Sequence, residues 1–164
     1  MSAAGRNGTE TFLKRNAGSY NILHFATHGT YNYYQPLYSC LLFPATVEDD
    51  WRLNVWDVFE MNLNAKPVTL SECETGLGNI NSGDELTGLS RAFLFAGSSA
   101  VVVSLWAAAD YPTSLLMTGF YRHLKSSTIQ EALILAQREV MKIYPQPLYW
   151  APFVLIGNGN VKMD

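Results

Sequence analysis

Four short runs of mostly apolar residues stand out along the chain, and each ends in a polar or glycine-containing segment. Their lengths and their β-branched residues are typical of strands that are buried in a sheet. The runs are Ile22 to Ala26, Val68 to Ser71, Ala100 to Leu105 and Phe153 to Ile156. We therefore predict four strands that belong to one buried sheet.

The segments between the runs carry helical patterns with recognisable start signals. Two begin with a capping box, in which two side chains satisfy the free amides of the first turn: Ser82 with Glu85, and Thr128 with Glu131. The predicted helices run from 82 to about 96, from a first turn containing Pro112 towards Lys125, and from 128 to Pro145. Weaker helical patterns cover Thr9 to Asn16 and Leu53 to Phe59.

Strands that alternate with helices imply right-handed crossovers and a mainly parallel sheet covered by helices on both faces. The stretch from Tyr31 to Asp50 is rich in aromatics and lacks helical periodicity, which predicts a loop or short hairpin over that sheet. A length of 164 residues suits one core. The expected fold class is an α/β sandwich.

Composition and charge narrow the function classes. Hydrophobic residues make up 48% and charged residues 15% of the chain, and the net charge of -3 comes without a basic stripe, so nucleic acid is not an expected partner. Ala92 to Ala109 is uncharged over a membrane-spanning length, but Gly97-Ser98-Ser99 breaks it into a helix and a strand. The polar start lacks a secretory signal, and two cysteines make neither a disulfide framework nor a zinc set. We therefore expect a cytoplasmic location, with no membrane contact and no metal or other cofactor.

Three chemically capable side chains follow predicted strands. His28, Cys73 and Asp110 each lie at or just beyond a strand's carboxyl end, where open parallel sheets bind their ligands. If the first two strands are neighbours, an imidazole and a thiol meet there, and the imidazole can accept the proton of the thiol. We predict a Cys73/His28 site, with Gly29 and Gly76 allowing turns and the Gly29 amide facing an oxyanion.

Several segments resemble those of the CHAT domain, a bacterial branch of the caspase, gingipain and separase superfamily. The two signature segments are His24-Phe25-Ala26-Thr27-His28-Gly29 and Leu70-Ser71-Glu72-Cys73-Glu74-Thr75-Gly76. Further similar segments are Gly88 to Phe93, Ser104 to Trp106, Phe120-Tyr121, Glu131 to Leu133 and Trp150 to Phe153. The resemblance spans roughly Ile22 to Gly157.

The resemblance implies a caspase-like fold and a metal-free cysteine endopeptidase that cleaves a protein or peptide. His28 would be the general base and Cys73 the nucleophile, with the amides of Gly29 and Cys73 as oxyanion hole. It divides the chain into an N-terminal remnant with a short helix, 1–20, and the peptidase domain, 21–164. The family normally carries further strand and helix there, often preceded by helical repeats, so truncation and a regulatory repeat region are expected. Glu72 replaces a small residue, and a carboxylate there would raise the pKa of the thiol.

Other interpretations of these residues stay open. Cys73 can be a small buried residue, and His28 a polar cap on a turn. His24 and His28 have the spacing of helical metal ligands, but in a strand we expect His24 to be a hydrogen-bonded core histidine behind the site. Asp110 can cap the helix that contains Pro112, or line a pocket that favours Lys or Arg before the cut bond.

Two further points concern the reaction. Glu74 and Asp84 suggest a carboxylate pair for glycoside chemistry, but nothing else in the sequence supports it, and solvated loop charges explain them better. Trp106, Trp150, Phe93 and Phe120 are expected as core aromatics that form the walls of the cleft. A catalytically silent interaction module and a thiol hydrolase of small esters or amides are the alternatives to a peptidase.

Overall fold

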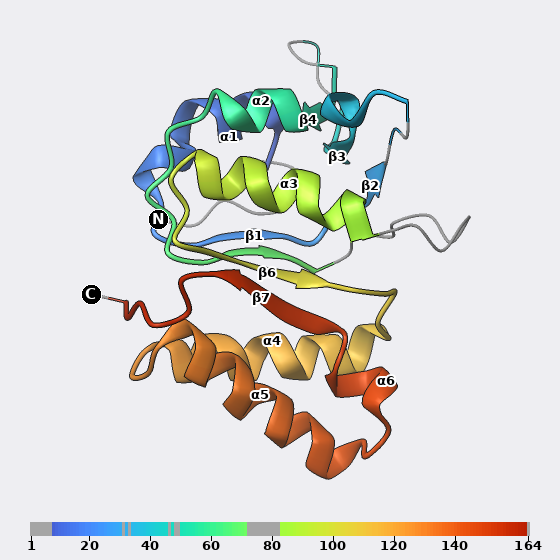
Figure 1. The fold of residues 1–164 in the computed structure, drawn as a ribbon, viewed down its shortest axis with the longest axis vertical. Helices are drawn as coiled ribbons and strands as arrows, with labels where there is room; N and C mark the ends of the chain where they lie inside the picture. The colour runs from blue at the N-terminus through green and yellow to red at the C-terminus, as the bar shows by residue number, and fades with distance from the viewer. Residues whose placement is uncertain are drawn as a thin grey trace.

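The computed structural model describes residues 8–30, 32, 34–45, 47, 50–71 and 83–163. Its main sheet has four strands in the order β1-β5-β6-β7 (Figure 1). These are β1 (Leu23–Phe25), β5 (Val68–Leu70), β6 (Ala100–Ser104) and β7 (Phe153–Gly157). The first three are parallel, and β7 runs antiparallel to β6. All four strands lie where the apolar runs predicted them.

Helices cover both faces of this sheet (Figure 1). One face carries α1 (Glu10–Asn16), α2 (Val55–Phe59) and α3 (Gly83–Phe95), and the other carries α4 (Asp110–Leu124) and α5 (Ile129–Ile143). The short α6 (Pro147–Trp150) and the 3-10 turns η2 (Ala17–Ser19) and η3 (Pro36–Tyr38) complete the helical elements of the described chain. The predicted α/β sandwich with a mainly parallel sheet is confirmed.

A second, smaller sheet lies beside α2. Its antiparallel strands are β2 (Gly29–Thr30), β3 (Cys40–Leu42) and β4 (Arg52–Asn54). The stretch predicted as a loop or hairpin thus supplies β3, while the segment predicted as a helix from Leu53 begins as strand β4. The reason is packing: Leu53 pairs with Leu41, and both side chains are fully buried. The helix α2 begins only after Asn54, whose amide donates to Asp57 Oδ2 at 2.9 Å.

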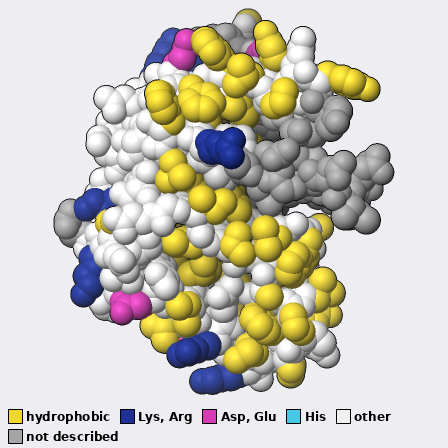
Figure 2. Space-filling view, viewed as in Figure 1, with side chains coloured by type: hydrophobic (Ala, Val, Ile, Leu, Met, Phe, Trp, Pro, Cys, Tyr) yellow, Lys and Arg dark blue, Asp and Glu magenta, His cyan; other side chains and the backbone are white. Residues whose placement is uncertain are grey.

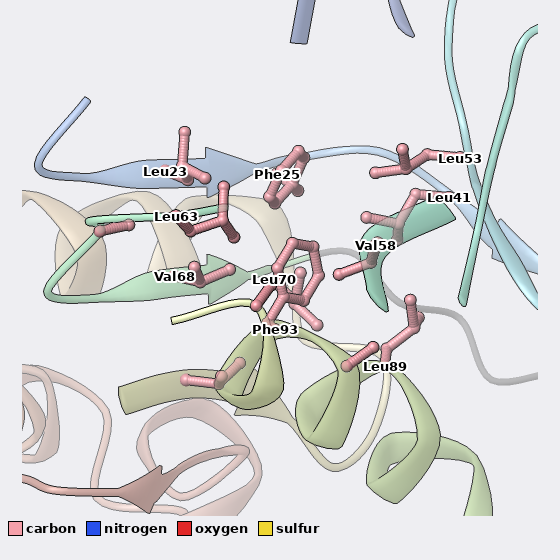
Figure 3. Close-up of a cluster of buried hydrophobic side chains, with 14 of the residues drawn as sticks. Leu23, Phe25, Leu41, Leu53, Val58, Leu63, Val68, Leu70, Leu89 and Phe93 are labelled. Atoms are coloured by element: carbon pink, nitrogen blue, oxygen red, sulfur yellow. The ribbon is translucent and has the colours of Figure 1, made fainter. Parts of the chain in front are cut away.

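The first core lies between the sheet and α3. Figure 3 shows Phe25 of β1, Leu70 of β5 and Phe93 of α3 converging, with Leu41 and Leu53 of the small sheet beside them. The rings of Phe25 and Phe93 lie 5.4 Å apart between centroids. This cluster fixes the small sheet against the main one, and so fixes the path of the chain between β1 and β3.

The second core lies on the opposite face, between β6, α4 and α5. Val102 packs there with Leu116 and Phe120 of α4 and Ala136 of α5, and all four side chains are fully buried. The capping box at the start of α5 is present as predicted, because Glu131 Oε2 accepts from the Thr128 amide at 2.9 Å. The side chains of the box predicted at Ser82 and Glu85 lie outside the described residues.

Gly97 turns the chain from α3 into β6. Its φ of 113° lies in the region that favours glycine, and a Cβ there would stand 2.4 Å from the carbonyl oxygen of Leu63. The break predicted within Ala92 to Ala109 is therefore a tight backbone crossing. Within the part of the chain that the structure describes, no helix is both long and apolar enough to cross a membrane.

Candidate functional site

The strands that lead to the predicted dyad are direct neighbours. β1 pairs in parallel with β5, and Phe25 stands opposite Leu70 in the register. His28 comes three residues after Phe25, and Cys73 comes three residues after Leu70. The strands that precede His28 and Cys73 in the sequence therefore end side by side. Cys73, Gly76, Glu72 and Glu74 lie outside the described residues, as does the side chain of Asp84.

The backbone at His28 is held by the small sheet, while the residue itself is exposed. The Leu42 amide donates to the His28 carbonyl at 2.8 Å, and the Thr27 hydroxyl donates to the Leu42 carbonyl. These contacts fix the chain on both sides of the Cα of His28. The imidazole thus stands on an anchored strand end, with its side chain open to solvent.

Gly29 lies in strand β2, where we had expected a backbone turn. Positive φ values at described glycines occur at Gly97 and Gly157. The Gly29–Leu41 pair is of the non-hydrogen-bonded kind, because the ladder bond next to it joins Leu42 to His28. The Gly29 amide therefore points away from β3.

Asp110 is the first residue of α4, beyond the carboxyl end of β6. The cap position belongs to Ala109, whose carbonyl accepts from the Thr113 amide at 3.1 Å. The interpretation of Asp110 as the side-chain cap is therefore wrong. Its exposed carboxylate lies in the first turn, where the helix dipole favours a negative charge.

Apolar side chains surround this end of β6. Leu105, Tyr111 and Leu148 are exposed by 44%, 64% and 57%. The Trp106 indole donates to the Leu148 carbonyl at 3.3 Å and so joins the loop after β6 to α6. Figure 2 shows hydrophobic side chains gathered over α6 and the end of β6.

The four aromatics predicted as core residues differ in their burial. Phe93 and Phe120 are fully buried, as expected. Trp106 and Trp150 are only partly buried, and Trp150 packs against the second core from α6. Neither tryptophan is the fully buried core residue that we had expected.

His24 is hydrogen-bonded, as predicted, but it does not lie in the core. Its Nδ1 lies 2.7 Å from the Tyr121 hydroxyl and its Nε2 lies 2.9 Å from Ser71 Oγ. The residue is exposed because, among the described strands, β1 is the edge strand of the main sheet. Sequence reasoning missed the partners Tyr121 and Ser71; the only signal was a polar residue at alternate spacing in an apolar strand.

Two further points concern Cys40 and possible metal ligands. Cys40 is a free, buried thiol in β3, and its Sγ lies 3.1 Å from the Thr30 hydroxyl. Among the described residues, no cluster of three or more His, Cys, Asp or Glu side chains is arranged to hold a metal ion.

Comparison with known proteins gives two similar relatives and one family. Tetratricopeptide repeat protein 28 from Mus musculus is 32% identical over 117 residues, which cover 68% of this chain and 5% of that protein. The Homo sapiens protein of the same name gives the same identity and coverage. The chain thus spans about one-twentieth of the length of these mammalian relatives.

The family model of the CHAT domain matches residues 2–158, nearly the whole chain. The match agrees with the resemblance found in the two signature segments and with the caspase-like arrangement of the sheet and helices. The chain belongs to the CHAT domain family of caspase-like, cysteine peptidase-related domains.

Proposed function

We propose that this CHAT domain is a cysteine endopeptidase that cleaves a protein partner, with Cys73 as nucleophile and His28 as general base. The observation that supports the proposal is the register of β1 and β5, because the strands that lead to His28 and to Cys73 end side by side. An imidazole on an anchored strand end is suited to accept a proton from a thiol on the neighbouring segment.

The reaction divides into two transfers. The Cys73 thiol gives its proton to the His28 imidazole, and the thiolate attacks the scissile carbonyl to form a tetrahedral oxyanion. Collapse of this intermediate breaks the C–N bond, the amine leaves with the proton from His28, and an acyl-enzyme remains. Water then gives a proton to His28, attacks the thioester and releases the acid and the thiol.

The amides of Gly29 and Cys73 are proposed to bind the oxyanion. The orientation of Gly29 supports this role, because its N–H takes no part in the pairing with β3. Donors that are fixed by the fold stabilise the developing charge without reorganising during the reaction.

Asp110 is proposed to line the pocket for the residue before the cut bond and to favour Lys or Arg there. Its exposed carboxylate at the start of α4 supports this role, because the cap position is Ala109. We expect Asp110→Asn to lower cleavage after Lys or Arg in a peptide-library digest by about tenfold, with little change in the melting temperature. A loss of stability with unchanged preference would contradict the assignment.

A helical-repeat region is the proposed regulator. The similar mammalian proteins are named for tetratricopeptide repeats, and the chain matches only a small part of each. A reducing compartment such as the cytoplasm suits a nucleophilic thiol, and Cys40 is likewise a free thiol.

The deciding experiment compares thiol reactivity with cleavage in single variants. Cys73→Ala should abolish cleavage, and His28→Ala should reduce it almost as far, because residues that act as a unit fail together. Cys40→Ala is the matched control and should leave cleavage largely intact. The rate of iodoacetamide labelling of Cys73 near neutral pH should fall when His28 is removed.

The same labelling separates the peptidase from a silent interaction module. Glu72 is the observation that favours the module, because a carboxylate beside the thiol disfavours the thiolate. Fast labelling of Cys73 that depends on His28 would support the dyad even if the isolated chain cleaves no test protein. Slow labelling that ignores His28 would overturn the proposed function.

A further inference from the structure

We propose that His24 is a positioning residue, which holds Ser71 and thereby the point where the Cys73 segment leaves the sheet. This inference rests on the proposed function of Cys73 and His28. Its basis is a set of hydrogen bonds on the α4 face of the sheet, which join β1, the end of β5 and α4 through one imidazole.

The His24 ring makes a contact at each nitrogen. Nδ1 lies 2.7 Å from the Tyr121 hydroxyl, which in turn donates to Thr69 Oγ1 at 3.0 Å. Nε2 lies 2.9 Å from Ser71 Oγ. A neutral ring with its proton on Nδ1 satisfies all of these groups, because it donates to Tyr121 and accepts from Ser71. Although the residue as a whole is exposed, the surrounding side chains partly remove its ring from water, and this desolvation lowers the pKa of His24 and favours that neutral form.

Ser71 is the last described residue before the segment that carries Cys73. Its amide donates to the Phe25 carbonyl at 2.9 Å, and the residue is 7% exposed. The Phe25 carbonyl is a second acceptor within reach of the Ser71 hydroxyl, at 3.4 Å, but the contact with His24 Nε2 is shorter, at 2.9 Å. His24 therefore holds the side chain of Ser71 while β1 fixes its backbone. Because His28 follows β1 in the sequence and Cys73 follows Ser71, the same contact joins the strand that leads to the proposed base to the strand that leads to the proposed nucleophile.

The position of His24 in β1 argues against a role in packing alone. Leu23 and Phe25 supply the contact of β1 with the hydrophobic core, whereas His24 faces α4 at the exposed end of the sheet. Its ring lies 5.6 Å from that of Tyr121 between centroids, so Tyr121 is the aromatic side chain of α4 that reaches it. The imidazole differs from an apolar side chain at this position because its two nitrogens make directional hydrogen bonds to separate partners, Tyr121 and Ser71.

Two matched substitutions separate these nitrogens. Gln at position 24 places an amide atom near the position of Nε2, so His24→Gln can keep the bond to Ser71. Asn is shorter and reaches only the position of Nδ1, so His24→Asn can keep the bond to Tyr121 but not the one to Ser71. We expect His24→Asn to slow the His28-dependent labelling of Cys73 by about tenfold, and His24→Gln to stay within about twofold of wild type.

Hydrogen exchange at the Ser71 amide provides a second readout that needs no catalytic activity. Exchange should be faster in His24→Asn and unchanged in His24→Gln, with similar melting temperatures for the two variants. If both variants lose labelling and exchange protection equally, His24 is a packing residue and the inference fails. Slow, His28-independent labelling of the wild-type chain would overturn the proposed function, and the exchange pattern would still decide the role of His24.

Discussion

Strands β6 and β1 belong to one sheet and run in the same direction, yet their surroundings differ. Every residue of β6 is at most 2% exposed, and the strand is paired on both sides with β5 and β7. In β1, Leu23 and Phe25 are buried but His24 between them is exposed. The central strand is committed to packing on both faces, whereas the edge strand packs with one face and keeps the other for polar contacts.

This difference explains where chemistry is located in the fold. The helices α4 and α5 pack on Val102 of β6, whereas at β1 the polar contact with α4 is the hydrogen bond between His24 and the Tyr121 hydroxyl. A polar side chain in the central strand would lose its hydration without gaining hydrogen-bond partners. In the edge strand it stays partly hydrated and also has hydrogen-bond partners. The histidines of the first signature segment lie on the strand, or on its continuation, where a polar residue costs least.

The largest expected effect comes from placing a charge within β6, compared with a charge placed just before β1. Val102→Asp should cost about 4 kcal/mol or more, because the carboxylate would be buried between β5, β7 and α4 without a partner. Ile22→Asp, just before β1, is the matched control and should cost less than about 1 kcal/mol, since Ile22 is 36% exposed. Urea denaturation followed by circular dichroism measures both. Equal losses in the two variants would contradict the comparison.

Much of the fold could be predicted because local sequence patterns alone specify the central strand and the start of α5. The run Ala100 to Leu105 is apolar on both faces, and only a fully covered strand accommodates that. Thr128 and Glu131 define the start of α5 through contacts within one turn. Such local signals do not depend on the rest of the molecule, which is why they agree with the structure.

The small sheet and the edge contacts could not be predicted in the same way. Strand β4 exists because Leu53 pairs with Leu41, a contact that no local pattern encodes, so a helix was expected in its place. The partners of His24 come from β5 and from α4, far away in sequence. For the candidate site, the sequence predicted the residue types and the strands that they follow. The orientation of the Gly29 amide and the position of the cap at Ala109 depend on tertiary structure and could not be predicted.

The smallest effect concerns Tyr121, which joins the two regions. Its burial raises the pKa of the phenol to about 12, so the folded state favours the neutral hydroxyl that donates to Thr69. A folded pKa above the ordinary value of 10.0 means that this stabilisation is complete below pH 10.0 and is lost as the pH rises towards 12.

Tyr121→Phe removes that hydroxyl, so the stability of this variant can be compared with that of the wild type as the pH rises. It should cost about 1 kcal/mol at pH 9, because Thr69 and His24 each lose a hydrogen-bond partner. The difference between wild type and variant should close by about pH 11, since deprotonation in the unfolded state by then removes roughly 1.4 kcal/mol from the wild type alone. Urea denaturation of both proteins at several alkaline pH values measures this, and other titrating groups cancel in the difference. A difference that stays constant from pH 9 to 11 would mean that the hydroxyl is hydrated, and that α4 does not cover the edge strand as closely as its contacts with His24 and Thr69 indicate.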